Sequence, residues 1–246
     1  EEKVTSPLIP LHTPLTYSQP TTMKGQGGKG DILEDLSKAI EIVKSWSDPR
    51  TNPEAVVPKE LLENCHGLVF HHFLKLGAII SGSFGSGFVI AKVHKGTPDE
   101  HWSGPSALSS GAMGVGAQVG GEMVHNVFVL NTAEAVEAYY KQAKLKIGTD
   151  ITCTVLEGDF RLEKSTDINT LISAPMCAYS YSRGAIIGVS VEGTVLGANQ
   201  EANYAFYGKT MSTKDILTDE REKKLDAKYL ALAELYGQLD VYNKHA

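Results

Sequence analysis

The chain has 246 residues, of which 42% are hydrophobic and 21% are charged, and its formal net charge is −6. This composition is that of an ordinary globular protein that buries a core without disulfide bonds. The negative charge argues against nucleic acid as the main partner, because binding to phosphates draws on a basic surface. Strong attraction to an anionic membrane would likewise require a local basic patch.

The lengths of the apolar runs and the spacing of the cysteines further restrict the class of protein. No run approaches the roughly 18 apolar residues that cross a bilayer, and the stretch 68–91 is interrupted by histidine, lysine, glycine and serine. The three cysteines, Cys65, Cys153 and Cys177, show no CxxC spacing, which favours buried free thiols in a reducing compartment. We therefore expect a cytoplasmic protein that is soluble or peripheral to a membrane.

The N-terminal region divides into a leader and a helix. Residues 1–30 contain four prolines and the run KGQGGKG, which predict an extended, flexible leader. From Asp31 to Trp46, apolar residues recur at helical spacing, and Pro49 follows. This pattern predicts an amphipathic helix over about residues 31–46.

The middle of the chain is rich in β-branched and aromatic residues and is punctuated by glycine. Two helices are expected within it, a short one at Lys59–Asn64 and a longer one at Ala133–Lys144, with Thr132 as N-cap and Gly148 after its end. The predicted strands are 67–73, 78–81, 87–93, 123–130, 151–156, 178–181 and 185–195. This order predicts an α+β fold, a β-rich single domain of largely antiparallel sheet with flanking amphipathic helices.

The predicted domain covers residues 31–217, and a C-terminal helix is expected over residues 218–246. The apolar residues of that helix follow the alternating spacing of a coiled-coil seam, and they are Leu225, Tyr229, Leu232, Tyr236 and Leu239. Two heptads are too few to define a coiled coil. Two interpretations stay open, because the helix can dock on its own domain or bind a partner helix.

Residues 106–123 are rich in glycine, as phosphate-binding loops are, and their sequence is SALSSGAMGVGAQVGGEM. The GxGxxG fingerprint fails because Val119 occupies the position of its third glycine. The P-loop motif also fails, since neither Gly-Lys pair has a glycine at the required distance before it. The small residues fit strands or a tight helix, in which two backbones pack closely.

Catalytic and metal-binding motifs are missing from the sequence. The histidines contain no HExxH spacing, and His71 and His72 are adjacent in a strand-like run, which predicts one satisfied core histidine and one surface histidine. No GxSxG string offers a hydrolase nucleophile, and the cysteines have apolar neighbours. We therefore predict a protein that is not an enzyme and that holds no metal or cofactor.

Several short strings occur in a fixed order along the chain. They are WSGPS at 102–106, the small-residue run that follows, VFVLNT at 127–132, YSYSRG at 179–184, GVSVEG at 188–193, NY at 203–204, YG at 207–208 and STKDIL at 212–217. In this order, over about residues 58–217, the chain closely resembles the SYLF domain. No single string is specific, and the resemblance rests on their collinear order.

The resemblance implies a lipid-binding module, often selective for phosphoinositides, and an actin-binding one in fungal actin-patch members. It also implies that the glycine run is part of the domain framework. Two positions depart from the family pattern. Residues 156–161 keep only a glycine and Arg161 of a Gly-Pro-x-Gly-Arg-like segment, and His125-Asn126 replaces an acidic residue. If these positions shape a ligand pocket, we expect altered or lost lipid specificity.

In some relatives an amphipathic helix before the domain inserts into membranes, and residues 31–46 occupy the equivalent place. The predicted lipid-binding residues are Ile32, Leu33, Leu36, Lys38, Ile40, Val43, Lys44 and Trp46, with Arg161 and Arg183, whose guanidinium groups suit phosphate. Four acidic and two basic residues in the helix predict weak electrostatic affinity for membranes. Docking of the helix on the domain core is the alternative.

Two further sets of basic residues are candidates for phosphate contacts. They are Lys92 with Lys95, and Lys141 with Lys144 and Lys146; a solvated helix face is the other interpretation of the second set.

The predicted function is therefore non-catalytic binding to phosphoinositide-containing membrane and a link from that membrane to actin filaments. The alternative is a structural subunit of a larger protein assembly, in which residues 1–30 and the C-terminal helix are the contacts.

Overall fold

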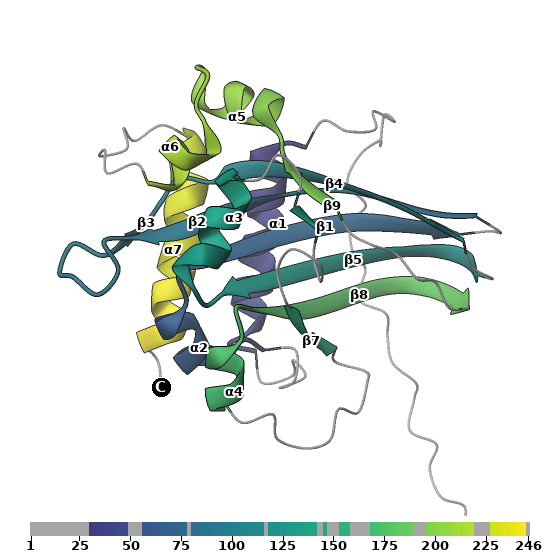
Figure 1. The fold of residues 1–246 in the computed structure, drawn as a ribbon, viewed down its shortest axis with the longest axis horizontal. Helices are drawn as coiled ribbons and strands as arrows, with labels where there is room; N and C mark the ends of the chain where they lie inside the picture. Colours follow the sequence, from purple (N-terminus) through teal and green to yellow (C-terminus); the bar gives the residue numbers. More distant parts are fainter. Residues whose placement is uncertain are drawn as a thin grey trace, which may run out of the picture.

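A long β-sheet with helices on both faces forms the frame of the protein (Figure 1). The computed structural model describes residues 30–48, 56–77, 80–115, 118–141, 145–146, 153–157, 168–188, 195–218 and 227–244. The strands are β1 Gly67–Gly77, β2 Ile80–Val93, β3 His101–Trp102, β4 Ser106–Val115, β5 Gln118–Leu130, β6 Leu145–Lys146, β7 Cys153–Glu157, β8 Met176–Gly188 and β9 Val195–Ala198. The helices are α1 Ile32–Ser45, α2 Lys59–Asn64, α3 Ala133–Lys141, α4 Ile168–Ser173, α5 Gln200–Tyr207, α6 Thr213–Leu217 and α7 Ala227–Lys244.

The strand order within the described residues is β6-β9-β4-β2-β1-β5-β8-β7, and β3 pairs with β2. Neighbouring strands in this sheet pair antiparallel, except that β7 and β8 are parallel. The prediction of a single α+β domain with a largely antiparallel sheet is confirmed.

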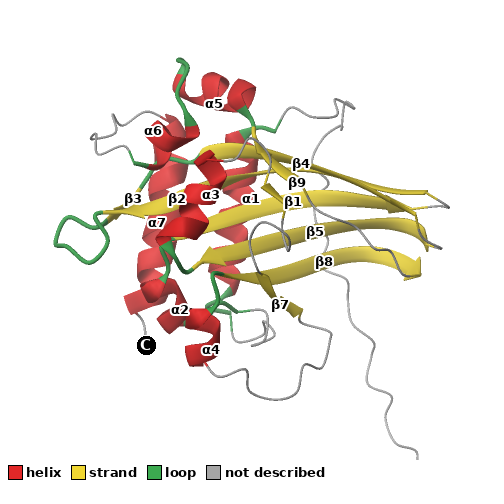
Figure 2. Cartoon of the chain, viewed as in Figure 1, coloured by secondary structure: helices red, strands yellow, loops and turns green. Residues whose placement is uncertain are grey.

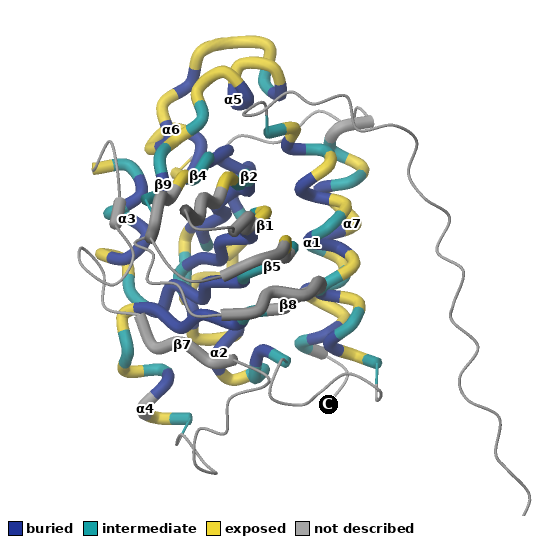
Figure 3. The backbone as a smooth tube through the Cα atoms, turned by 90° about the vertical axis from the view of Figure 1, so that its right-hand side faces the viewer, coloured by how far each residue is buried: buried dark blue, intermediate teal, exposed yellow. Residues whose placement is uncertain are grey.

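Helices cover both faces of the sheet at one end of the strands. Because side chains alternate along a strand, Leu68 and Phe70 pack on the face of α1 and α7, whereas Val69 packs on the face of α3 and α6. Figure 3 shows these two layers on opposite sides of the strands. Burial on both faces explains why the strand segments here are continuous apolar runs rather than alternating ones.

The strands are longer than the helical layers. Figure 2 shows the helices gathered at one end, while β1, β2, β4, β5 and β8 continue beyond α1. Each of these strands has 10 to 14 residues, which is well above the usual length of about five or six. Helices therefore cover one half of the sheet, which we call the covered half, and the strands continue into a second half, which we call the open half.

Glycine-rich segments lie inside these long strands. In the run 106–123, residues 106–115 form β4 and residues 118–123 begin β5, so the described part adopts the first of the two expected structures, strands or a tight helix. The predicted strands 78–81 and 87–93 were wrong as separate elements, because the described part of both belongs to β2. Likewise, 178–181 and 185–188 belong to the single strand β8. Glycine at these positions lets neighbouring strands approach instead of ending the strand.

Several other expectations can be compared with the structure. The N-cap at Thr132 is confirmed, since its hydroxyl accepts a hydrogen bond from the Ala135 amide at 3.1 Å. Helices α4, α5 and α6 were missed, because segments of five to eight residues are too short to show a helical period. Gly148, the segment 189–194 and the predicted start of the C-terminal helix at 218–219 lie wholly or partly outside the described residues.

The adjacent histidines differ from their prediction in one respect. They point to opposite faces, as expected, but both are buried, at 0% exposure for His71 and 3% for His72. The expectation of a surface histidine was wrong because α1 covers the face on which His72 lies.

Two glycines of the sheet should respond differently to alanine. A Cβ atom on Gly87 would lie 2.0 Å from the Phe70 carbonyl oxygen, whereas a Cβ on Gly111 would meet no atom within 4 Å. We expect Gly87→Ala to lower the free energy of unfolding by at least about 2 kcal/mol, and Gly111→Ala to change it by less than about 0.5 kcal/mol. Urea denaturation of both variants tests this, and equal stabilities would contradict the close strand approach.

Candidate functional site

Helix α1 carries most of the predicted lipid-binding residues, and it lies against the sheet. The Asp31 carboxylate caps the helix by accepting a hydrogen bond from the Leu33 amide at 2.9 Å, and acidic residues in the first turn suit the helix dipole. The apolar members of the predicted set are buried in the core, namely Ile32, Leu36, Ile40, Val43 and Trp46, and Leu33 packs partly buried against them. In this structure the stripe contacts protein.

Helix α7 packs beside α1. Lys44 of α1 forms an ion pair with Glu234 of α7 at 2.6 Å, and the rings of Trp46 and Tyr242 meet edge to face at 5.3 Å between centroids. The Tyr242 hydroxyl donates to the Val57 carbonyl at 2.7 Å. Of the two interpretations of the C-terminal helix, the structure shows the one in which it docks on its own domain.

A row of polar side chains lies under α1, where the helix crosses the sheet. Ser86 donates to the buried carboxylate of Asp35 at 2.9 Å, and Lys38 approaches the same carboxylate at 3.6 Å. In register with Ser86 across β1 and β5 are His72 and His125, whose Nδ1 atoms lie 2.7 Å apart. One imidazole of this pair donates to the other. We call Ser86, His72 and His125 the polar row.

Burial controls the charge of these groups. It raises the pKa of Asp35 from 3.8 to about 6, against the lowering effects of Lys38 and of the Ser86 hydrogen bond. Burial also lowers the pKa of His71 to about 3, and burial together with His125 lowers the pKa of His72 to about 2. Both histidines are therefore neutral near pH 7, and His71 is held by a 2.6 Å hydrogen bond with the Ser110 hydroxyl.

Two residues along each strand from the polar row, the side chains on the same face of the sheet are apolar and more exposed. Phe84, Leu74 and Met123 lie opposite one another on β2, β1 and β5. Phe84 is 68% exposed and Leu74 is 39% exposed, and Met123 is half-buried. We call these three residues the apolar row. The apolar row was not among the residues predicted from the sequence, although a lone phenylalanine among glycines and serines, in GSFGSG at 82–87, was a signal for it.

The predicted cationic residues are dispersed. Lys38 also pairs with Glu34 at 2.8 Å, and its side chain stays 31% exposed. Arg183 occupies the register position opposite Met123 on β8, next to the apolar row. Arg161 and Lys144 lie outside the described residues. Lys141 forms an ion pair with Glu137 within α3, which agrees with a solvated helix face.

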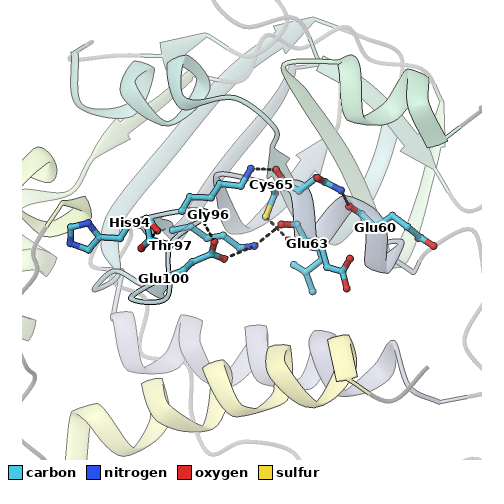
Figure 4. Close-up of polar contacts among 11 residues, drawn as sticks. Glu60, Glu63, Cys65, His94, Gly96, Thr97 and Glu100 are labelled. Atoms are coloured by element: carbon cyan, nitrogen blue, oxygen red, sulfur yellow. Dashed lines mark hydrogen bonds and ion pairs between the residues drawn. The ribbon is translucent and has the colours of Figure 1, made fainter.

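Lys92 and Lys95 have structural partners at the end of α2, where Figure 4 labels Glu63 and Glu100. The Lys92 ammonium donates to the Glu63 carbonyl at 2.8 Å and pairs with Glu100 at 3.1 Å. Lys95 donates to the Asn64 carbonyl. Two cations thus satisfy carbonyl groups that a helix C-terminus leaves free, and they join the loop after β2 to α2. These contacts account for the lysine pair without a ligand.

The strings that carry the family resemblance also make framework contacts. In WSGPS, the Ser103 hydroxyl accepts from the Ala91 amide at 3.0 Å, and the Ser103 carbonyl accepts from the hydroxyl of Tyr236 on α7. The Pro105 carbonyl accepts from the Tyr207 hydroxyl at 2.9 Å. This string therefore joins the sheet to α5 and α7.

Polar residues of the other strings act in the same way. Asn131 of VFVLNT donates to the carbonyls of Leu171 and Ala174, both at 2.8 Å. The Asn203 side chain accepts from the Ala107 amide at 2.7 Å, and Ser212 begins α6 with a capping box. These contacts explain the strings as parts of the fold.

Two features are absent from the part of the chain that the structure describes. No helix there is long and apolar enough to cross a membrane. The same residues contain no cluster of three or more histidine, cysteine or acidic side chains arranged to hold a metal ion.

The buried histidines make stability depend on pH. The unfolded chain protonates His71 and His72 near pH 6.5, but the folded chain does not until about pH 3 and 2, so acidification favours unfolding by about 1.4 kcal/mol per pH unit for each. Asp35 acts in the opposite direction below about pH 6, because its folded pKa is raised. We expect the free energy of unfolding to be about 2 to 3 kcal/mol lower at pH 5 than at pH 7.

Urea denaturation at a series of pH values measures this dependence. His71→Gln should remove a large part of the loss, since one of the two neutral histidines is then absent. A flat profile between pH 5 and 7 would show that the two imidazoles are not held neutral by burial.

Comparison with known proteins places the chain among relatives. A family model described as Ysc84, Las17-binding protein actin regulator, matches residues 111–239, a little more than half of the chain. An SH3 domain-containing protein of Schizosaccharomyces pombe is 33% identical over 212 residues, which cover 85% of this chain and 45% of that protein. The LAS seventeen-binding protein 3 of Saccharomyces cerevisiae is 33% identical over 189 residues, covering 76% of this chain and 40% of that protein.

A human protein, SH3 domain-containing YSC84-like protein 1, is 30% identical over 222 residues, which cover 87% of this chain and 60% of the human protein. The chain thus spans less than two thirds of the length of each of these relatives. The family match agrees with the resemblance drawn from the collinear strings. The chain belongs to the Ysc84/SYLF family of actin regulators.

Proposed function

We propose that this chain is a non-catalytic module, peripheral to membranes in the cytoplasm, that binds phosphoinositide-containing membrane and links it to actin. The observation that carries the proposal is membership of a family described as actin regulators. Lipid binding is what the SYLF resemblance implies, and the open half of the sheet supports it by presenting apolar side chains to solvent. The relatives' names assign Las17 binding to longer proteins, so the proposal for this chain is confined to membrane and actin.

The docked form of α1 is the form that we propose to meet the membrane. Insertion of its apolar stripe into lipid would first uncover Ile32, Leu36, Ile40, Val43 and Trp46, all buried in the core. At roughly 2 kcal/mol for each side chain, undocking costs on the order of 10 kcal/mol, which is as large as the stability of a typical domain. In the docked helix, Lys38 and Lys44 still reach solvent.

The alternative is a structural subunit that contacts partners through residues 1–30 and the C-terminal helix. Leu232, Leu235 and Leu239 of α7 are already buried in the domain core. Only the outer side of the described helix, with Leu230 at 61% and Val241 at 45% exposure, presents large apolar groups. The described part of α7 thus offers a partner few exposed apolar side chains.

Vesicle flotation and actin co-sedimentation test the proposal. The full chain should float with vesicles that carry individual phosphoinositides more than with phosphatidylserine or neutral vesicles, and should pull actin filaments into the floating fraction. Deletion of residues 1–46 would remove α1 from the core, so deletion of residues 1–29 is the proper truncation. Arg161→Gln and Arg183→Gln test the two arginines. Absence of flotation with every lipid at moderate salt would contradict the proposal.

A covalent cross-link between α1 and α7 tests whether α1 stays docked or inserts when the protein binds a membrane. Lys44→Cys and Glu234→Cys, joined by a short bismaleimide in a Cys153→Ser background, would fix α1 to α7 at their ion pair. We expect the locked protein to bind vesicles within about twofold of the unlinked protein, since the exposed surface is unchanged. Loss of binding on locking, with recovery after cleavage of a cleavable linker, would show instead that the stripe of α1 inserts.

A further inference from the structure

The loop that joins β2 to β3 has a histidine at each side of its base. His94 directly follows β2, and His101 is the first residue of β3. Val93 and His101 are partners in the strand register, so the two histidines lie side by side. Their ring centroids are 6.0 Å apart, with an angle of 50° between the ring planes. Both residues are exposed, and Figure 1 shows the loop projecting from the end of the sheet beyond β3.

Hydrogen bonds within the loop fix the backbone around these histidines. The His94 carbonyl accepts from the Thr97 amide at 3.1 Å and from the Thr97 hydroxyl at 2.8 Å, and the Glu100 carboxylate accepts from the Gly96 amide at 2.8 Å. His94 itself has a φ of 54°, in the left-handed region that few residues other than glycine adopt. Such a conformation persists only where the surroundings impose it, and it recurs at ligand sites.

The main chain also orients the His101 ring. Its Nδ1 atom lies 2.7 Å from the Asp99 carbonyl oxygen. Because a carbonyl oxygen can only accept, Nδ1 carries the proton and donates it, which leaves the lone pair of the neutral ring on Nε2. Histidines that bind metals commonly have this arrangement, in which a backbone carbonyl holds one ring nitrogen and the other nitrogen binds the ion. Figure 4 shows the His94 ring directed away from Glu63 and Cys65.

From this geometry we propose that His94 and His101 together bind a divalent transition-metal ion that prefers nitrogen ligands, such as Zn²⁺, Ni²⁺ or Cu²⁺. Two imidazoles on one tetrahedral zinc ion, with Zn–N bonds of about 2.0–2.1 Å, place their ring centroids roughly 5 Å apart. The observed separation of 6.0 Å therefore requires an approach of about 1 Å, which rotation of two exposed side chains supplies. Ca²⁺ and Mg²⁺ should not bind, because they require oxygen ligands.

The site goes beyond the proposed function and revises the expectation that the chain holds no metal. That expectation rested on the absence of HExxH spacing, whereas these two histidines are separated by six residues. The described residues contain no cluster of three or more metal-binding side chains, so the ion has two protein ligands and keeps water in its other positions. We therefore expect micromolar affinity, which is weaker than that of a structural zinc site with four protein ligands.

Calorimetric titration of the full chain with zinc chloride tests the site. We expect His94→Gln and His101→Gln each to weaken Zn²⁺ binding at least about tenfold. His66→Gln is the matched control, because His66 is partly exposed and its carbonyl accepts from the Lys92 amide of the same strand β2. This control should stay within about twofold of the unchanged protein. Thermal unfolding without metal should show that all three variants keep the fold.

Copper quenching gives a second readout, which reports the position of the ion. Trp102 follows His101 in β3, whereas Trp46, the other tryptophan of the chain, is buried in the core. Cu²⁺ should bind at least as tightly as Zn²⁺ and should quench the emission of Trp102. Trp102→Phe should abolish this quenching without weakening Zn²⁺ binding, whereas His101→Gln should reduce both.

The outcomes decide the inference independently of the vesicle and actin tests. If Zn²⁺ binds but neither His94→Gln nor His101→Gln weakens it, the ion lies elsewhere and the inference is overturned. An equal loss in His66→Gln, or no binding below millimolar Zn²⁺, would overturn it as well. Binding of Ca²⁺ or Mg²⁺ as strong as that of Zn²⁺ would show that the two imidazoles are not the ligands. None of these results changes the proposed function, which flotation tests separately.

Discussion

The burial of α1 on the sheet is the contact on which the rest of the domain depends. Near the helical end, the strands are apolar on both faces, and neither face is stable in water without a cover. One face is closed by α3 and α6, and the other by α1, with α7 packed beside it. The apolar side of α7 is used in this layer, so the C-terminal helix completes the domain.

The same contact divides the sheet into two halves with different roles. Buried polar groups under α1, with Asp35 bound to Ser86 and His72 paired with His125, mark the boundary. Unpaired charge in such a place is costly, and burial keeps the histidines neutral. On the covered side the residues stabilise the fold. On the open side, Phe84 and Leu74 contribute little to the core and are free to contact a partner.

The resemblance to the family rests largely on residues that hold the fold together. The strings at 102–106 and 127–132 join strands to helices through Ser103, Pro105 and Asn131. Such residues are needed by any chain with this fold, whichever ligand it binds. The family is therefore recognised from framework contacts, which by themselves do not identify a ligand.

The sequence alone determined the fold class, the position of α1 and the family, because these depend on local periodicity and on the order of short strings. It predicted an amphipathic stripe from Ile32 to Trp46, but it left open whether protein or lipid covers that stripe. Only the tertiary structure shows the stripe packed into one core cluster with Leu68 and Phe70. It also decided the exposure of Phe84 and the burial of His72, because which face of a strand meets a helix depends on contacts between residues far apart in the chain.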